Sequence, residues 1–199
     1  LSEAWLPRIL HAADLDSTWL LLTADHGESW AERPGCPTPT GVFDLHGNSL
    51  FEEVLRVPLL LRPPGGGAPR KIPQLTRTVD ILPTLADLLP LDSHPPRSAE
   101  LDGASVANAV EGKAPPLQGD AVSVMNRDFV NAPSLPRSPA DLWSAFSLTT
   151  PRHKLIWQPG VGGKADRRQA YDLTLDPGET RDISDERLPD LERGWLRLK

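Results

Sequence analysis

Asp25 and His26 are the residues best suited to chemistry in this chain, because they stand side by side after a short apolar run, residues 19–22. In open α/β sheets, ligands bind beyond the carboxyl ends of the strands. Carboxylate and imidazole groups both bind divalent cations, and Gly27 lets the backbone turn without a side-chain clash. The pair therefore predicts a metal site. The alternative is a polar turn in which Asp25 caps a following helix.

Two buried strands are expected to position this pair. The run at 19–22 is typical of a parallel strand buried on both faces, and residues 57–61 predict a second strand. Pro58 favours the start or an edge of that second strand. Residues 29–48 between them are rich in Pro, Gly and Thr, and so long a loop is uncommon in a compact domain unless it is functional.

Helices are predicted on either side of these strands. Residues 8–14 indicate a short helix, provided that Pro7 lies in its first turn. Asp80 is expected to cap a second helix that has Pro83 in its first turn and one apolar stripe.

The second half of the chain predicts a connecting stretch and then an antiparallel sheet. Residues 90–120 are rich in proline and glycine, which indicates little regular structure. Residues 176–179 suggest a type II turn with Pro177 and Gly178 at its centre. Short strands are expected at 121–124, 145–149, 154–157 and 171–173, and a final helix over 188–198.

The composition narrows the class of protein. The chain has 199 residues, 39% hydrophobic and 24% charged, as in a globular protein of one or two domains. A net charge of −6 provides no basic field for nucleic acid, and no apolar run is long enough for a membrane span. The chain begins at Leu1 and its only methionine is Met125, so we expect a fragment or processed chain whose localisation stays open.

Four segments together resemble the second half of sulfatases, which belong to the alkaline phosphatase superfamily. They occur in the family's order, and four ordered segments are harder to match by chance than one short motif. The segments are residues 23–28, 46–60, 79–85 and 171–180.

The resemblance implies an α/β fold. We expect part of an alkaline-phosphatase-like, mostly parallel sheet flanked by helices, followed by a small α+β domain with an antiparallel sheet. The expected division is 1–92 for the C-terminal part of the catalytic core, 93–120 for a connecting stretch and 121–199 for the C-terminal domain.

The resemblance also implies that Asp25 and His26 bind a divalent cation together with two carboxylates from nearer the N-terminus of the full protein. Many members have Asn where His26 stands and hold calcium, which prefers oxygen ligands. Calcium is therefore favoured, while His26 leaves manganese and zinc open. Glu28 is expected to support the ligands or to start a helix, rather than to bind the ion.

His46 matches a family histidine on a loop that faces the substrate. There it could contact a sulfate or phosphate oxygen, or protonate the leaving group. Alternatively, it only pins the turn at Gly47. Asn48 could hydrogen-bond the same anion, although many relatives have a lysine nearby. Glu52 and Glu53 indicate ordinary helix surface, and Arg56, Arg62 and Lys71 are expected to be solvated or structural.

The nucleophile that the resemblance implies is absent from this chain. It is a Cys or Ser converted to formylglycine within Cys/Ser-x-Pro-x-Arg, well before the Asp-His pair. After Cys36 the proline comes one residue too early, and Thr40 replaces the arginine. Cys36 is therefore interpreted as a plain loop thiol. We expect formylglycine only in the missing N-terminal part. The fragment by itself is therefore expected to be catalytically inactive.

The resulting hypothesis is metal-dependent hydrolysis of sulfate esters by the intact protein, acting on a small-molecule or glycan ester. One alternative is a phosphodiesterase, phosphonate monoester hydrolase or phosphoethanolamine transferase of the same superfamily, which shares the Asp-His pair. Another is a catalytically inactive binding module, in which Asp25 and His26 are residual turn residues. The identity of the substrate depends on the loops around the pocket, so the sequence does not indicate which ester is hydrolysed. It does not indicate an oligomeric state either.

Overall fold

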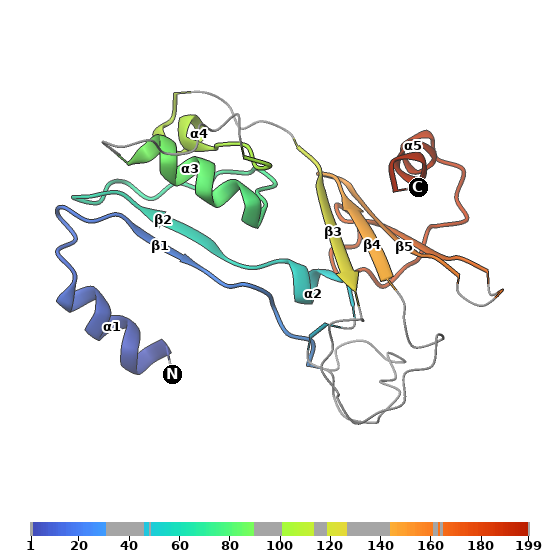
Figure 1. Ribbon diagram of the computed structural model, residues 1–199, viewed down its shortest axis with the longest axis horizontal. Coiled ribbons are helices and arrows are strands. Elements are labelled where there is room, and N and C mark those ends of the chain that lie inside the picture. Colours follow the sequence, from blue (N-terminus) through green and yellow to red (C-terminus); the bar gives the residue numbers. More distant parts are fainter. Residues whose placement is uncertain are drawn as a thin grey trace.

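The computed structural model describes residues 2–30, 46–47, 49–89, 101–113, 119–126, 144–160, 163 and 165–198. Strands β1 and β2 form one sheet, and four strands form a second sheet in the order β3-β4-β5-β6 (Figure 1). The elements are α1 (Ser2–Ala12), β1 (Leu20–Thr23), α2 (Glu52–Leu55), β2 (Leu59–Arg62), a 3-10 turn (Thr78–Asp80), α3 (Ile81–Leu88), α4 (Ala107–Glu111), β3 (Ala121–Asn126), β4 (Ser144–Thr149), β5 (His153–Gln158), β6 (Arg167–Asp172) and α5 (Pro189–Leu198).

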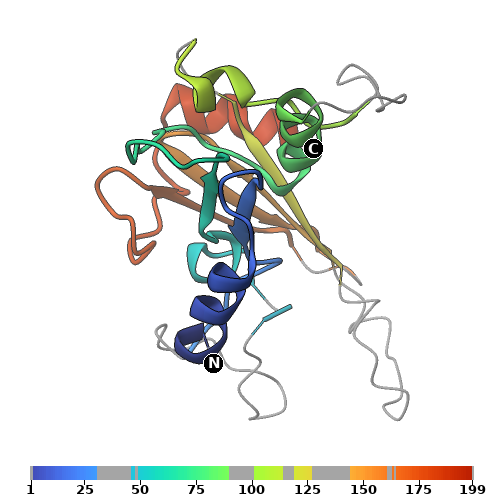
Figure 2. The same cartoon turned by 90° about the vertical axis from the view of Figure 1, so that its left-hand side faces the viewer.

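The first sheet lies between helices, as expected for the α/β class. Helices α3 and α4 lie above β1 and β2 in Figure 1 and α1 lies below them, an arrangement that Figure 2 shows from the side. Both strands occur where they were predicted. Their pairing is antiparallel, with Leu20 opposite Arg62 and Thr23 opposite Leu59, so the expectation of parallel strands is wrong for this pair. An apolar run does not encode strand direction.

The prediction that β1 and β2 are buried on both faces is also only partly correct. Leu22 is 41% exposed and Leu60 58% exposed, so neither strand is covered on both faces by the described residues. A run of leucines indicates that a strand can be buried, but whether it is buried depends on what packs against it.

Three expectations about helices need correction. Helix α1 begins at Ser2, so Pro7 lies inside it and not in a first turn. As an interior proline, Pro7 has no N–H to donate to the Glu3 carbonyl, and its ring crowds that carbonyl. Helix α3 has Pro83 in its first turn as predicted, but the Asp80 side chain makes no capping hydrogen bond to it. Helix α4 lies within the stretch expected to be irregular, and it ends at Glu111, followed by Gly112 in a left-handed conformation.

The second sheet is antiparallel throughout, which confirms the prediction for this half of the chain. Its two faces carry separate apolar clusters. One cluster joins the sheet to α5, and the other joins it to residues around α2, so each face is covered in part, while Val122 and Val124 of β3 stay exposed. The first contains Leu148, Leu155, Ala170, Ile183, Leu191 and Leu198, and the second Leu50, Met125, Ala145, Ile156 and Tyr171, with Phe51 and Leu55 packed against it.

The turn at 176–179 differs from its prediction. Its N–H···O bond runs from Glu179 to the Asp176 carbonyl at 3.0 Å, but the positive φ belongs to Glu179 (51°) and not to Gly178. A type II turn requires a positive φ at its third residue, so the prediction is wrong. None of the helices among the described residues has the length and apolar character needed to cross a bilayer.

Candidate metal and anion site

The loop that carries the candidate ligands follows β1 directly and is held by α2. The Gly27 N–H donates to the Val54 carbonyl oxygen at 2.8 Å. A Cβ on Gly27 would lie 2.1 Å from the Glu53 carbonyl oxygen, which no side chain could accommodate. Glycine is therefore required here by close backbone approach. The contact fixes the backbone immediately after Asp25 and His26.

Asp25 and His26 present two donor atoms close together. Asp25 Oδ2 lies 3.8 Å from His26 Nε2, and the two side chains are 89% and 39% exposed. His26 Nδ1 lies 2.8 Å from the Gly27 carbonyl oxygen. Since a carbonyl oxygen only accepts, Nδ1 carries a proton, and Nε2 keeps its lone pair in the neutral ring.

The protonation of both groups follows from these contacts. The backbone N–H of His26 donates to Asp25 Oδ1 at 3.0 Å. Chiefly because of this hydrogen bond, the pKa of the Asp25 carboxyl lies below its usual value, and the group is ionised at neutral pH. The hydrogen bond to the Gly27 carbonyl raises the pKa of His26 above its ordinary value. A cation that binds His26 Nε2 therefore competes with a proton.

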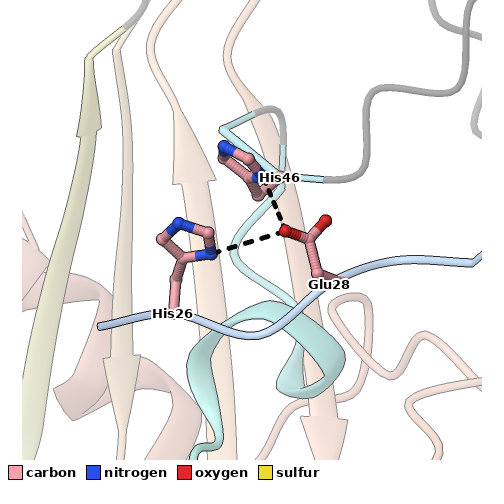
Figure 3. Close-up of side chains that lie close together, drawn as sticks. All are labelled: His26, Glu28 and His46. Carbon is pink, nitrogen blue, oxygen red and sulfur yellow. Dashed lines mark hydrogen bonds and ion pairs between the residues drawn. The ribbon is translucent and has the colours of Figure 1, made fainter. Parts of the chain in front are cut away.

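His46 lies against His26 and Glu28 although it comes from the far end of the loop (Figure 3). His46 Nδ1 lies 2.8 Å from Glu28 Oε1, and His26 Nδ1 lies 3.9 Å from the same oxygen. The two imidazole rings are 4.1 Å apart between centroids and tilted by 30°. Glu28 thus fixes the orientation of the His46 ring.

These residues fit a divalent cation. One potential ligand atom from each of His26, Glu28 and His46 lies within 4.8 Å of the others. Glu28 Oε2 is buried and has no hydrogen-bond partner among the described residues, and such an oxygen could be satisfied by a cation or a further donor. Imidazole nitrogens with a carboxylate suit manganese or zinc, whereas calcium would need additional oxygen ligands.

The structure brings Asp25, His26 and His46 to one place, whereas Asn48 and Cys36 lie outside the described residues. Arg62 is structural, since its guanidinium donates to the Leu15 carbonyl oxygen at 2.7 Å.

Sequence reasoning missed the role of Glu52, which was expected to be surface. Glu52 Oε1 lies 2.5 Å from the Nζ atom of the fully buried Lys154, and the Glu52 N–H donates to Glu179 at 2.8 Å. The sequence did contain a signal for this role. Lys154 stands at the start of a predicted apolar strand, and a lysine buried there requires an acidic partner elsewhere in the chain.

Known proteins similar to this chain are sulfatases. The family model described as Sulfatase matches residues 6–91. Arylsulfatase K of Mus musculus is 29% identical over 184 residues, which cover 89% of this chain and 29% of that protein. N-acetylgalactosamine-6-O-sulfatase of Bacteroides thetaiotaomicron is 26% identical over 182 residues, which cover 85% of this chain and 33% of that protein. The chain thus spans about a third of the length of these relatives.

Solved structures share the fold. A protein from Bacteroides fragilis described as a sulfatase superposes with a TM-score of 0.65 at 21% identity, covering 99% of this chain and 37% of the other. A 2-O GAG sulfatase superposes with a TM-score of 0.62 at 22% identity, covering 91% and 34%. At these identities the likeness concerns the fold alone.

Proposed function

We propose that this chain, which belongs to the sulfatase family, forms part of an enzyme that hydrolyses sulfate esters in a metal-dependent reaction. The observation that supports the proposal is that His46 lies beside the Asp25-His26 pair after the end of β1. An exposed carboxylate, a neighbouring imidazole and a second imidazole are the groups needed to hold a cation beside an anionic ester. We keep the proposed division of the chain into part of the catalytic core (1–92), a connecting stretch (93–120) and a C-terminal domain (121–199).

In this proposal Asp25 and His26 are cation ligands. Calcium, manganese and zinc remain the candidates, with two further carboxylates and a formylglycine nucleophile contributed from outside this chain. When bound, the cation would offset the negative charge on the sulfuryl oxygens. The separation of 3.8 Å between Asp25 Oδ2 and His26 Nε2, which leaves room for one ion to bind both atoms, supports a shared ligand role.

His46 is proposed to act on the substrate. Its Nδ1 donates to the Glu28 carboxylate, which holds the ring in one orientation, and in the doubly protonated ring Nε2–H would be the donor to an ester oxygen. From there it would either bind the sulfate group or deliver a proton to the leaving oxygen. Asn48, two residues further on, is proposed to hydrogen-bond the same anion.

The substrate is proposed to be a glycan or small-molecule sulfate ester. The names of the relatives support this class, since they include an arylsulfatase, an N-acetylgalactosamine-6-O-sulfatase and a 2-O GAG sulfatase. These names do not agree on one sugar or one position, so the proposal extends to the ester class only.

The test is a hydrolysis assay on the full-length protein, coexpressed with a formylglycine-generating enzyme. Turnover of p-nitrophenyl sulfate is compared with that of the phosphate monoester and a phosphate diester, in wild type, Asp25→Ala and the control Asp87→Ala, which removes an exposed carboxylate from α3. We expect sulfate turnover that is lost only in Asp25→Ala. Preferential diester turnover would instead favour the phosphodiesterase alternative, and inactivity on every ester would favour a binding module.

A further inference from the structure

A buried lysine in the C-terminal sheet is connected to the loop that carries Asp25 and His26. We propose that Lys154, together with Glu52 and Glu179, positions this loop through helix α2. The link to catalysis rests on the proposed function, whereas the structural coupling does not.

The first step is the burial of Lys154. Its side chain is 0% exposed, and its Nζ lies 2.5 Å from Glu52 Oε1 and 3.0 Å from Glu179 Oε1. A charge removed from water destabilises the fold unless it is paired and hydrogen-bonded, and an apolar side chain is often at least as stable in such a place. Ile156, two residues along β5, fills the same face with an apolar group. Lys154, unlike an apolar residue, pairs with two carboxylates from distant segments of the chain and so holds them close to each other.

The second step is the attachment of α2 by Glu179. The Glu179 side chain is also 0% exposed, and its Oε2 accepts the Glu52 N–H at 2.8 Å across 127 residues of sequence. The residue preceding α2, Phe51, makes no side-chain capping hydrogen bond, so Glu179 provides an acceptor for the first turn. Glu179 adopts a left-handed φ of 51°, unfavourable for a side chain with a Cβ, and its contacts with Glu52 and Lys154 give a reason for it.

The third step leads from α2 to the candidate ligands. The Val54 carbonyl of α2 accepts the Gly27 N–H at 2.8 Å, and the Glu53 carbonyl occupies the space of a Gly27 side chain. Helix α2 therefore contacts the loop backbone directly after His26. A shift of α2 cannot leave Gly27 in place without breaking this contact. The connection runs without a gap from Lys154 and Glu179 through α2 to the Asp25-His26 pair.

The test compares Lys154→Met with Leu155→Ala in the full-length protein. Leu155 is the next residue of β5 and packs in the cluster on the α5 side of the sheet, so its truncation weakens the same strand away from α2. The first readout is hydrogen exchange of the segment that contains Gly27, at a temperature where both variants are folded. The second is the affinity for Mn²⁺ and Ca²⁺, measured by titration.

We expect Lys154→Met to speed exchange around Gly27 by about tenfold and to weaken cation binding by about 10- to 100-fold. Leu155→Ala should speed exchange in α5 and leave the Gly27 segment as in wild type. Unchanged exchange around Gly27 in Lys154→Met, or an equal increase in both variants, would overturn the inference. Since exchange requires no turnover, a protein without sulfatase activity that shows the expected pattern would refute the proposed function alone.

A milder variant covers the case in which Lys154→Met does not fold. Glu52→Gln keeps the shape of a partly exposed side chain and removes its charge from the ammonium. We expect exchange around Gly27 to increase in the same direction, by about threefold. Wild-type exchange in this variant would count against the inference.

Discussion

At the scale of single residues, the site depends on a position without a side chain. Replacing Gly27 by alanine would force its Cβ into the Glu53 carbonyl, so either the loop or α2 must move. We expect Gly27→Ala to lower the free energy of unfolding by about 1–3 kcal/mol and turnover by about 100-fold. Urea unfolding and the p-nitrophenyl sulfate assay measure the two effects.

Gly119→Ala is the matched control for this prediction. A Cβ at Gly119 meets nothing within 4 Å, so this variant should behave as wild type. Equal stability and turnover in the two alanine variants would show that the close approach at Gly27 is unimportant.

A second residue-scale prediction concerns pH. Asp172 Oδ1 accepts the Thr174 hydroxyl at 2.6 Å, and Oδ2 lies 2.9 Å from the Arg152 guanidinium. Mainly because of the Thr174 hydrogen bond, the pKa of Asp172 lies well below its ordinary value despite burial. A depressed pKa means that the folded state favours the ionised carboxylate. This stabilisation is fully present above about pH 4 and is lost as the pH falls through the folded pKa.

Thermal melting of wild type and Asp172→Asn measures this effect. We expect the variant to melt at a lower temperature at pH 7, and the difference to shrink as the pH is lowered from about 4 towards 2. A difference in melting temperature that stays constant over this range would contradict the assignment.

At the scale of elements, Asp80 joins the start of α3 to the segment before α4. Its carboxylate accepts the N–H groups of Arg77 and Ala104, both at 2.8 Å, and pairs with the Arg77 guanidinium at 2.7 Å. Burial alone would raise the pKa of Asp80, but the contacts with Arg77 and Ala104 lower it overall. Asp80→Ala would leave several donors without an acceptor, and we expect it to cost about 2–4 kcal/mol in urea unfolding. Asp87→Ala, on the exposed side of α3, should cost less than about 0.5 kcal/mol, and equal losses would refute this role for Asp80.

The sequence predicted elements where the signal is local. The strands of the second sheet follow from short apolar runs between turn residues, and α3 follows from its proline and its apolar spacing. Strand direction in β1 and β2, and the capping of α2 by Glu179, depend on residues far away in the sequence. Local patterns can show that a buried lysine needs a partner but not which residue it pairs with, which is why Glu52 was expected to be surface.

At the scale of the whole molecule, the candidate site was predictable in its composition but not in its geometry. The motif around Asp25 and the position of His46 in the ordered segments pointed to three residues, Asp25, His26 and His46, which the structure brings close together. The approach of the two tilted imidazole rings and the contact of Glu28 with His46 join residues that are far apart in the sequence. Leu50, four residues after His46, packs in the cluster that joins residues around α2 to the second sheet.

The most direct measurement of the central claim is the metal content and sulfate turnover of the full-length protein, in wild type and in the Asp25→Ala/His26→Ala double variant. Inductively coupled plasma mass spectrometry counts the bound cations, and p-nitrophenyl sulfate reports turnover. We predict one tightly bound divalent cation in wild type, and the loss of both the cation and turnover in a double variant that still melts cooperatively. Equal metal content and equal turnover in the two proteins would contradict the account.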